Sequence, residues 1–275
     1  MALRLPGVAE HVLTDALWLR LEPLIPVPQR RYRFPGRRRV DNRAALEGIL
    51  FVVRTGIRWN DLPTTMFGAS GATCWRRLKE WYEAGVWQQL HEALLAELRA
   101  AGLLDLAHAA VDSSHLRALK GGPRTGPSPV DRGRLGSKHH LITDASGLPL
   151  AVILTGGNRN DVTQLLPLID AIPPIRGLRG RPRQRPRRLL ADRGYDHDKY
   201  RRLLRQRRIT PMIARRGSGH GSGLGKPRWV VERTFSWLHN FHRLRTRYER
   251  RADIHQAMLS IACSLICLRR HLNSF

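Results

Sequence analysis

Hydrophobic residues recur with helical spacing over roughly the first third of the chain. Leucine, isoleucine and valine fall on one face of a helix predicted over residues 44–54, with Asp41 and Asn42 placed to cap it. Two further helices are predicted over residues 70–85 and 86–101, and a glycine ends or follows each of them. This part of the chain is therefore expected to be entirely helical.

Short apolar runs with strand spacing replace this pattern in the rest of the chain. Residues 106–111 predict a buried strand that ends on Asp112, and RRLLAD predicts a second one that ends on Asp192. SKHHLITD and LPLAVILTG flank the turn residues DASG, an arrangement typical of a β-hairpin. Helical patterns return over residues 228–248 and 254–271. Strands separated by helices indicate a layered α/β structure.

The change of pattern divides the chain into two expected domains. Residues 1–102 would form a small all-helical domain, and residues 103–275 an α/β domain built on a mixed sheet. Two helices of the first domain resemble a helix-turn-helix with a long connection, whose second helix would present Arg76, Arg77 and Lys79 to DNA. An ordinary amphipathic helix with a solvated basic face explains the same residues equally well.

The charge balance points to a polyanionic partner. The 275 residues include 48 lysines and arginines against 22 aspartates and glutamates, which gives a formal net charge of +26. Such an excess favours nucleic acid first and an anionic membrane second, because neutralising phosphates releases counterions. Hydrophobic residues make up 42% of the chain, enough for a packed core, which excludes a disordered tail.

Other classes of protein lack their sequence signatures here. No secretory signal opens the sequence, and its longest apolar run, residues 259–268, is too short to span a bilayer. The three cysteines form no CxxC pair, and no GxxxxGK[ST] loop for nucleotide phosphates occurs. We therefore expect a cytoplasmic protein that uses neither a membrane nor a nucleotide cofactor.

Three carboxylates lie where a metal site can form. Asp112 and Asp192 end buried strands, and Glu232 lies in the first turns of a long helix. Converging carboxylates repel one another unless cations neutralise them, and Mg²⁺ prefers such oxygen ligands. Position alone is a weak indicator, because aspartates after strands often cap turns and single helical glutamates are usually solvated.

The segments around these acids carry a more specific signal. Four of them occur in order: VDSSHLRALKGG, SKHHLITDASGLPLAVILTGGNRNDV, LLADRGYDHDKYRRLL and GKPRWVVERTFSWLHNFHRLRTRYERR. Together they resemble the IS5 family of bacterial insertion-sequence transposases over nearly the whole chain. The resemblance implies an RNase H-like catalytic domain of the DDE type, with Asp112, Asp192 and Glu232 as catalytic and metal-binding residues. It also implies two Mg²⁺ ions as cofactors, with Mn²⁺ as a substitute.

The predicted glutamate helix departs from a signature of related transposases, Tyr-x2-Arg-x3-Glu-x6-Lys. Arg228 matches the arginine, whereas a glycine stands at the tyrosine position and His239 at the lysine position. We therefore expect His239, Arg243 or Arg245 to supply the basic group for DNA. On one continuous helix, steps of three and four residues would place Arg228, His239 and Arg243 on the face of Glu232. A salt bridge to the glutamate is the alternative role for Arg228.

The expected function is that of a DNA transposase. It would bind the terminal inverted repeats of an insertion sequence, then cleave and transfer DNA strands, with basic stretches 176–188 and 243–251 holding the backbone. Joining two ends of double-stranded DNA to a target requires a homodimer or a larger assembly, at the nucleoid. Two alternatives are an inactive transposase-derived regulator and an RNase H-like structure-specific nuclease. Metal-dependent joining separates a transposase from both.

Overall fold

The N-terminal part of the protein is helical, as predicted. The computed structural model describes residues 13–29, 32–34, 38–217 and 225–272. The first elements are α1 (Asp15–Leu21), the 3-10 helix η1 (Glu22–Leu24), α2 (Asn42–Thr55), η2 (Trp59–Asp61), α3 (Thr64–Phe67), α4 (Gly71–Glu83) and α5 (Val86–Ala100). The carboxylate of Asp41 accepts from the first turn of α2, and the hydroxyl of Ser70 accepts from that of α4. Both helices therefore begin at side chains that satisfy their free N–H groups.

Six strands of the described chain form one mixed sheet. They are β1 (His108–Arg117), β2 (Gly126–Pro127), β3 (Leu135–Asp144), β4 (Pro149–Gly156), β5 (Arg188–Ala191) and β6 (Thr210–Ile213). β1 pairs antiparallel with β3 and parallel with β5, while β4 extends one side of the sheet and β6 the other. The predicted β3–β4 hairpin is confirmed, and so is an α/β fold with a mixed sheet.

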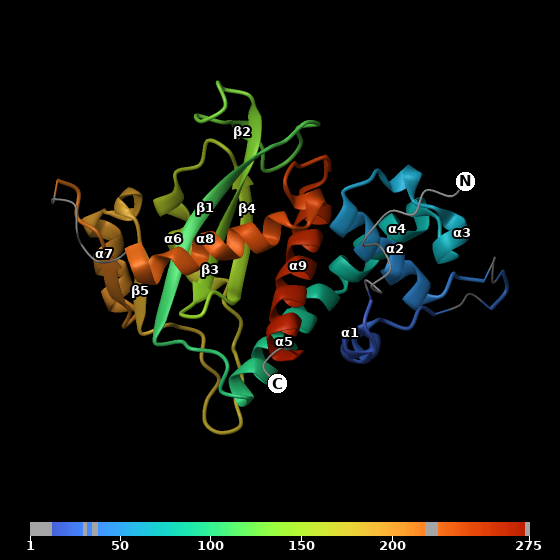
Figure 1. Cartoon of the computed structure of the whole chain (residues 1–275), viewed down its shortest axis with the longest axis horizontal. Helices are drawn as coiled ribbons and strands as arrows, with labels where there is room; N and C mark the ends of the chain where they lie inside the picture. Colours follow the sequence, from blue (N-terminus) through green and yellow to red (C-terminus); the bar gives the residue numbers. More distant parts are fainter. Residues whose placement is uncertain (1–12, 30–31, 35–37, 218–224, 273–275) are drawn as a thin grey trace.

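Helices cover the sheet and join it to the N-terminal part. They are η3 (Asp161–Gln164), α6 (Leu165–Asp170), η4 (Arg193–Tyr195), α7 (Asp198–Gln206), α8 (Gly225–His239), η5 (His242–Leu244) and α9 (Ala252–Leu272). Figure 1 shows α8 crossing the sheet and α9 standing between the sheet and the N-terminal helices. Because α9 is apolar on nearly every face, it is buried on both sides and connects one continuous core. No helix among the described residues is long and apolar enough to cross a membrane.

Two expected boundaries are wrong. β1 does not end at Asp112 but continues to Arg117, because these residues keep pairing with β3, with Asp112 opposite Leu141. The helix predicted over residues 228–248 stops at His239, where the chain turns into η5. A glycine-rich segment over residues 217–225 leads into α8, and it lies largely outside the described residues.

Candidate active site

Parallel pairing of β1 and β5 brings two of the predicted acids to the same level of the sheet. Ala110 of β1 lies opposite Leu190 of β5, and Asp112 and Asp192 each follow two residues later. Neighbouring strands lie about 4.8 Å apart, and residues two apart on a strand share a face. The fold therefore places the two aspartates side by side, although only Asp192 follows the end of its strand.

Main-chain groups orient both carboxylates. Asp112 Oδ1 accepts a hydrogen bond from the N–H of Ser113 at 2.8 Å. Asp192 Oδ1 accepts one from the N–H of Gly194 at 2.9 Å, which starts the 3-10 turn η4. A Cβ on Gly194 would lie 3.0 Å from the same oxygen, so a glycine suits this close turn.

Helix α8 brings the third acid across the sheet. Glu232 is largely exposed, and Arg228 lies one turn before it. The guanidinium of Arg228 bridges two elements: its Nη2 lies 3.2 Å from Glu232 Oε1, and its Nη1 lies 3.4 Å from Asp112 Oδ2. The salt bridge considered for Arg228 is therefore present, and Asp112 and Glu232 both pair with its guanidinium group.

The three acids share one electrostatic environment. Burial is the main reason that the pKa of Asp112 is raised to about 6. The Ser113 N–H and the charge of Arg228 oppose this rise, whereas the negative charges of Asp192 and Glu232 add to it. A cation placed among the acids would favour the ionised form of Asp112.

Tyr195 is a residue of this site that the sequence analysis missed. Its hydroxyl is buried without a hydrogen-bond partner in the described part of the chain. Burial raises its pKa, and the charges of Asp161, Asp112 and Asp192 raise it further. Its position three residues after Asp192, in the ADRGYD segment, was the available signal.

A hollow beside the glutamate gathers two predicted DNA contacts. Its lining consists of His115, Glu232, Phe235, Ser236, His239, Asn240 and Arg245. Arg245 Nε donates to the carbonyl of His239 at 2.6 Å. Burial and the charge of Arg245 lower the pKa of His239, so the imidazole is neutral near pH 7. Arg245 is therefore the positive charge of this hollow, which also includes His115 and Phe235, two residues that the sequence did not single out.

Arg243 is not part of that face. Because α8 stops at His239, the expectation of one continuous helical face is wrong, and Arg243 lies on η5 with only 5% of its surface exposed. Its guanidinium pairs with Glu249 at 2.7 Å and donates to the carbonyls of Gly56 and Ile57. Arg243 therefore connects the end of α2 with the segment that follows α8.

The basic residues of α4 have three different environments. Arg76 is exposed, and Lys79 forms a salt bridge with Glu83 at 2.8 Å. Arg77 is 5% exposed and donates to Asn42 Oδ1 at 2.9 Å and to a backbone carbonyl. The chain between α2 and α4 holds η2 and α3 rather than one tight turn.

Comparison with protein families identifies the enzyme class. Residues 104–267, which include all three acids, match a family model described as a transposase DDE domain. The chain belongs to this family. Residues 13–91 match a second model, described as a putative transposase of the IS4/5 family. The protein is thus a DDE transposase, an enzyme of polynucleotidyl transfer that depends on a divalent metal.

Two proteins of Burkholderia cepacia are similar to the transposase. A putative transposase for insertion sequence element IS402 is 70% identical over 147 residues, which are 54% of this chain and 70% of that protein. An uncharacterized 16.2 kDa protein of the same element is 55% identical over 123 residues, 44% of this chain and 84% of that protein. Among solved structures, the Mos1 strand transfer complex aligns at 10% identity with a TM-score of 0.33, over 88% of this chain and 79% of that one.

Proposed function

We propose that the transposase uses Asp112, Asp192 and Glu232 as its catalytic and metal-binding residues. The observation that carries the proposal is their convergence from β1, the end of β5 and α8, with Arg228 bridging two of them. The raised pKa of Asp112 supports it, because the negative charges of the other two acids contribute to that rise. Carboxylates that lie close together repel one another, and a bound cation reduces this repulsion.

The donor chemistry of this cluster fits a divalent cation. Three carboxylates offer oxygen alone, which suits Mg²⁺, with Mn²⁺ as a substitute. In the described residues no three acidic, histidine or cysteine side chains stand close enough to hold an ion as they are. Arg228 supplies positive charge between Asp112 and Glu232 instead. When bound, two ions would activate the attacking oxygen and stabilise the leaving oxygen of an in-line displacement.

The basic side chains around Glu232 have a complementary role in the proposal. Arg228 lies within reach of the acids, and Arg245 lines the adjoining hollow. Guanidinium groups bind phosphate oxygens with two parallel hydrogen bonds, so both can hold the DNA backbone beside the acids. His239 would act as a neutral hydrogen-bonding group, and Arg76 and Lys79 would contact DNA from α4.

We further propose an IS5-family transposase that acts on the ends of its own insertion sequence. The helical residues 1–102 would bind the terminal inverted repeats, and residues 103–275 would cleave and transfer strands. The IS4/5-family match over residues 13–91 and the IS402 relative support this proposal. Joining two DNA ends to a target calls for at least two protomers on double-stranded DNA, in the bacterial cytoplasm at the nucleoid.

A strand-transfer assay tests the assignment of the acids. Labelled DNA that carries the ends of the element is incubated with the transposase in Mg²⁺ or in EDTA. We expect joined products only with the metal, and a loss of at least about 10³-fold for Asp192→Asn, which corresponds to a barrier higher by about 4 kcal/mol. Asp170→Asn, at an exposed acid of α6, is the matched control and should retain activity.

Binding measured in EDTA separates catalysis from recognition. The Asp192→Asn variant should bind the ends as tightly as the wild type, because it keeps the fold and the basic surface. Strand transfer by this variant at the wild-type rate would show that the acid is not catalytic. Cleavage without joined products would instead support a nuclease.

A further inference from the structure

A short hairpin precedes β5 and carries arginines that the active site does not use. The backbone groups of Ile175 and Arg183 exchange two hydrogen bonds of 2.9 Å, which close the loop between them. We call residues 175–183 the arginine hairpin. Arg99 of α5 donates to the carbonyl of Ile175, and Gly177 leaves room for it, since a Cβ there would lie 2.9 Å from Arg99 Nε. The hairpin therefore projects from a fixed base, below the sheet and beside the end of α5 (Figure 1).

The tip of the arginine hairpin is strongly basic and open to solvent. Arg176, Arg179 and Arg181 are exposed, and the exposed fraction of Leu178 is 83%. In the part of the chain that the structure describes, none of these three arginines pairs with a carboxylate. Their charges remain available for an external polyanion.

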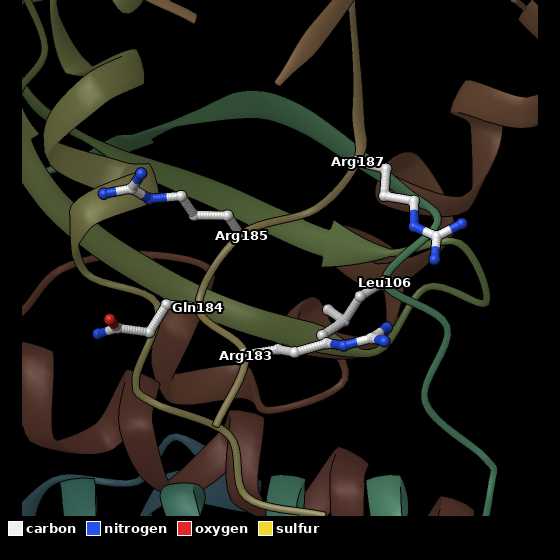
Figure 2. Close-up of a pocket in the computed structure, with 5 residues that line it drawn as sticks. All are labelled: Leu106, Arg183, Gln184, Arg185 and Arg187. Atoms are coloured by element: carbon white, nitrogen blue, oxygen red, sulfur yellow. The ribbon is translucent and has the colours of Figure 1, made fainter. Parts of the chain in front are cut away.

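The segment that leads from the hairpin to β5 continues this surface. Figure 2 shows Arg183 and Arg187 directed toward Leu106, while Gln184 and Arg185 extend to the other side of the same segment. Guanidinium groups thus lie on both sides of one extended chain. A groove walled by two phosphate backbones offers anions on both sides of a chain that enters it.

Strand register separates this surface from the acids. Arg188 lies opposite His108, four residues before Asp112 on β1. At a rise of about 3.3 Å per residue, the start of β5 lies about 13 Å along the strand from the level of Asp112. The hairpin precedes Arg188, so it would contact DNA several base pairs away from the phosphate that the acids attack.

We propose that the arginine hairpin inserts into the minor groove of duplex DNA, with Arg179 and Arg181 along its floor. The inference rests on the proposed function only for the choice of DNA as the polyanion. A narrow minor groove concentrates negative potential and favours inserted arginine side chains. The exposed Leu178 resembles the apolar residues with which minor-groove proteins contact base steps.

Gly180 suits this role by its conformation. It lies between the two arginines with a φ of +81°, and no atom lies within 4 Å of the place that a Cβ would take. A side chain is therefore disfavoured there by backbone strain and not by crowding inside the protein. The open space lets the backbone of the tip approach a groove floor closely.

Three duplexes distinguish a groove contact from a phosphate contact. They have the same length and carry a central block of A·T, G·C or inosine·C pairs. Inosine lacks the 2-amino group of guanine in the minor groove and keeps the major-groove pattern of G·C. In EDTA, we expect the transposase to bind the A·T and inosine·C duplexes about tenfold more tightly than the G·C duplex.

A charge-conserving variant assigns the preference to the hairpin. Arg179→Lys with Arg181→Lys keeps both charges but removes the planar guanidinium groups, so the preference should fall to about twofold or less. Arg202→Lys with Arg205→Lys, on the exposed surface of α7, is the matched control and should retain the preference.

Each outcome decides the proposal. Equal binding of the three duplexes by the wild type overturns it, and so does a preference that survives in the hairpin variant. Strand transfer is measured on the same preparations with Mg²⁺. Transfer without a groove preference rejects the hairpin inference alone, whereas a groove preference without transfer rejects the proposed catalytic site alone.

Discussion

Two arginine-rich stretches, residues 176–188 and 243–251, differ in how many of their arginines are buried. In the second, Arg247 is fully buried, and Arg243 and Glu249 are 5% and 7% exposed. In the first, the arginines are exposed, and within the described chain none of those before β5 pairs with a carboxylate. Both stretches were expected to hold the DNA backbone. Charge density alone therefore does not identify a DNA-binding segment.

The difference follows from what surrounds each stretch. Residues 243–251 run between α8 and α9, where the guanidinium of Arg247 donates to Ser137 Oγ and to four backbone carbonyls. An acid within the same stretch, Glu249, neutralises Arg243. Residues 176–188 contain no acid and cross the surface. We propose that Arg243 and Arg247 of residues 243–251 join parts of the fold, whereas the exposed arginines of residues 176–188 are free to bind DNA.

Removing the buried guanidinium should have the largest effect on stability. Arg247→Met leaves several buried acceptors without donors, each of which costs about 1–3 kcal/mol. We expect the free energy of unfolding to fall by at least about 3 kcal/mol, measured by urea denaturation. Arg250→Gln, at an exposed arginine of the same stretch, should change it by less than about 0.5 kcal/mol. Equal effects of the two variants would contradict the contrast between buried and exposed arginines.

A pair of buried histidines behind Glu249 should make stability depend on pH. His139 and His255 are fully buried with their Nε2 atoms 2.8 Å apart, and His255 Nδ1 lies 3.8 Å from Glu249 Oε2. Burial is the main cause that lowers the pKa of both histidines below the ordinary value of 6.5. Glu249 opposes this shift at His255, and the charge of Arg247 adds to it at both histidines. The unfolded chain therefore binds more protons than the folded one as the pH falls below that value. The stability that depends on the neutral histidines is fully present above pH 6.5 and is lost as the pH falls below that value.

The expected loss for each histidine is at most about 1.4 kcal/mol per pH unit, which is the slope for a difference of one bound proton. Urea unfolding between about pH 6.5 and about pH 5 measures the slope. His255→Gln should reduce the slope by the contribution of one proton, whatever it does to stability at neutral pH. A slope unchanged by this variant would show that His255 does not remain neutral in the folded state.

Local features of the fold could be predicted from sequence, and those that depend on distant partners could not. Asp41 caps its helix as expected, because a cap involves residues only three positions apart. The length of β1 depends on its pairing with β3, so an acid that was expected at a strand end lies inside the strand. The burial of Arg77 and Arg243 depends on residues of α2 and its flanks, which no local pattern reveals.

The candidate site shows the same limit. Family resemblance named the three acids, and the parallel register of β1 and β5 explains why two of them lie side by side. Neither the bridging position of Arg228 nor the buried hydroxyl of Tyr195 follows from spacing, because both arise where α8 and η4 pack against the sheet.

The smallest expected effect on the free energy of unfolding comes from the arginine hairpin, and it is an increase where Arg247→Met causes a decrease. Replacing Arg176, Arg179 and Arg181 together by glutamine removes three like charges from a chain with a net charge of +26. Within the described residues these three arginines have no carboxylate partner to lose, so repulsion alone changes, and unfolding should become harder by at most about 0.5 kcal/mol at low salt. The gain should vanish above about 0.5 M NaCl, where the Debye length is only a few ångströms. Destabilisation by this variant at any salt concentration would mean that the hairpin arginines support the fold, as Arg247 does, and are not held free for DNA.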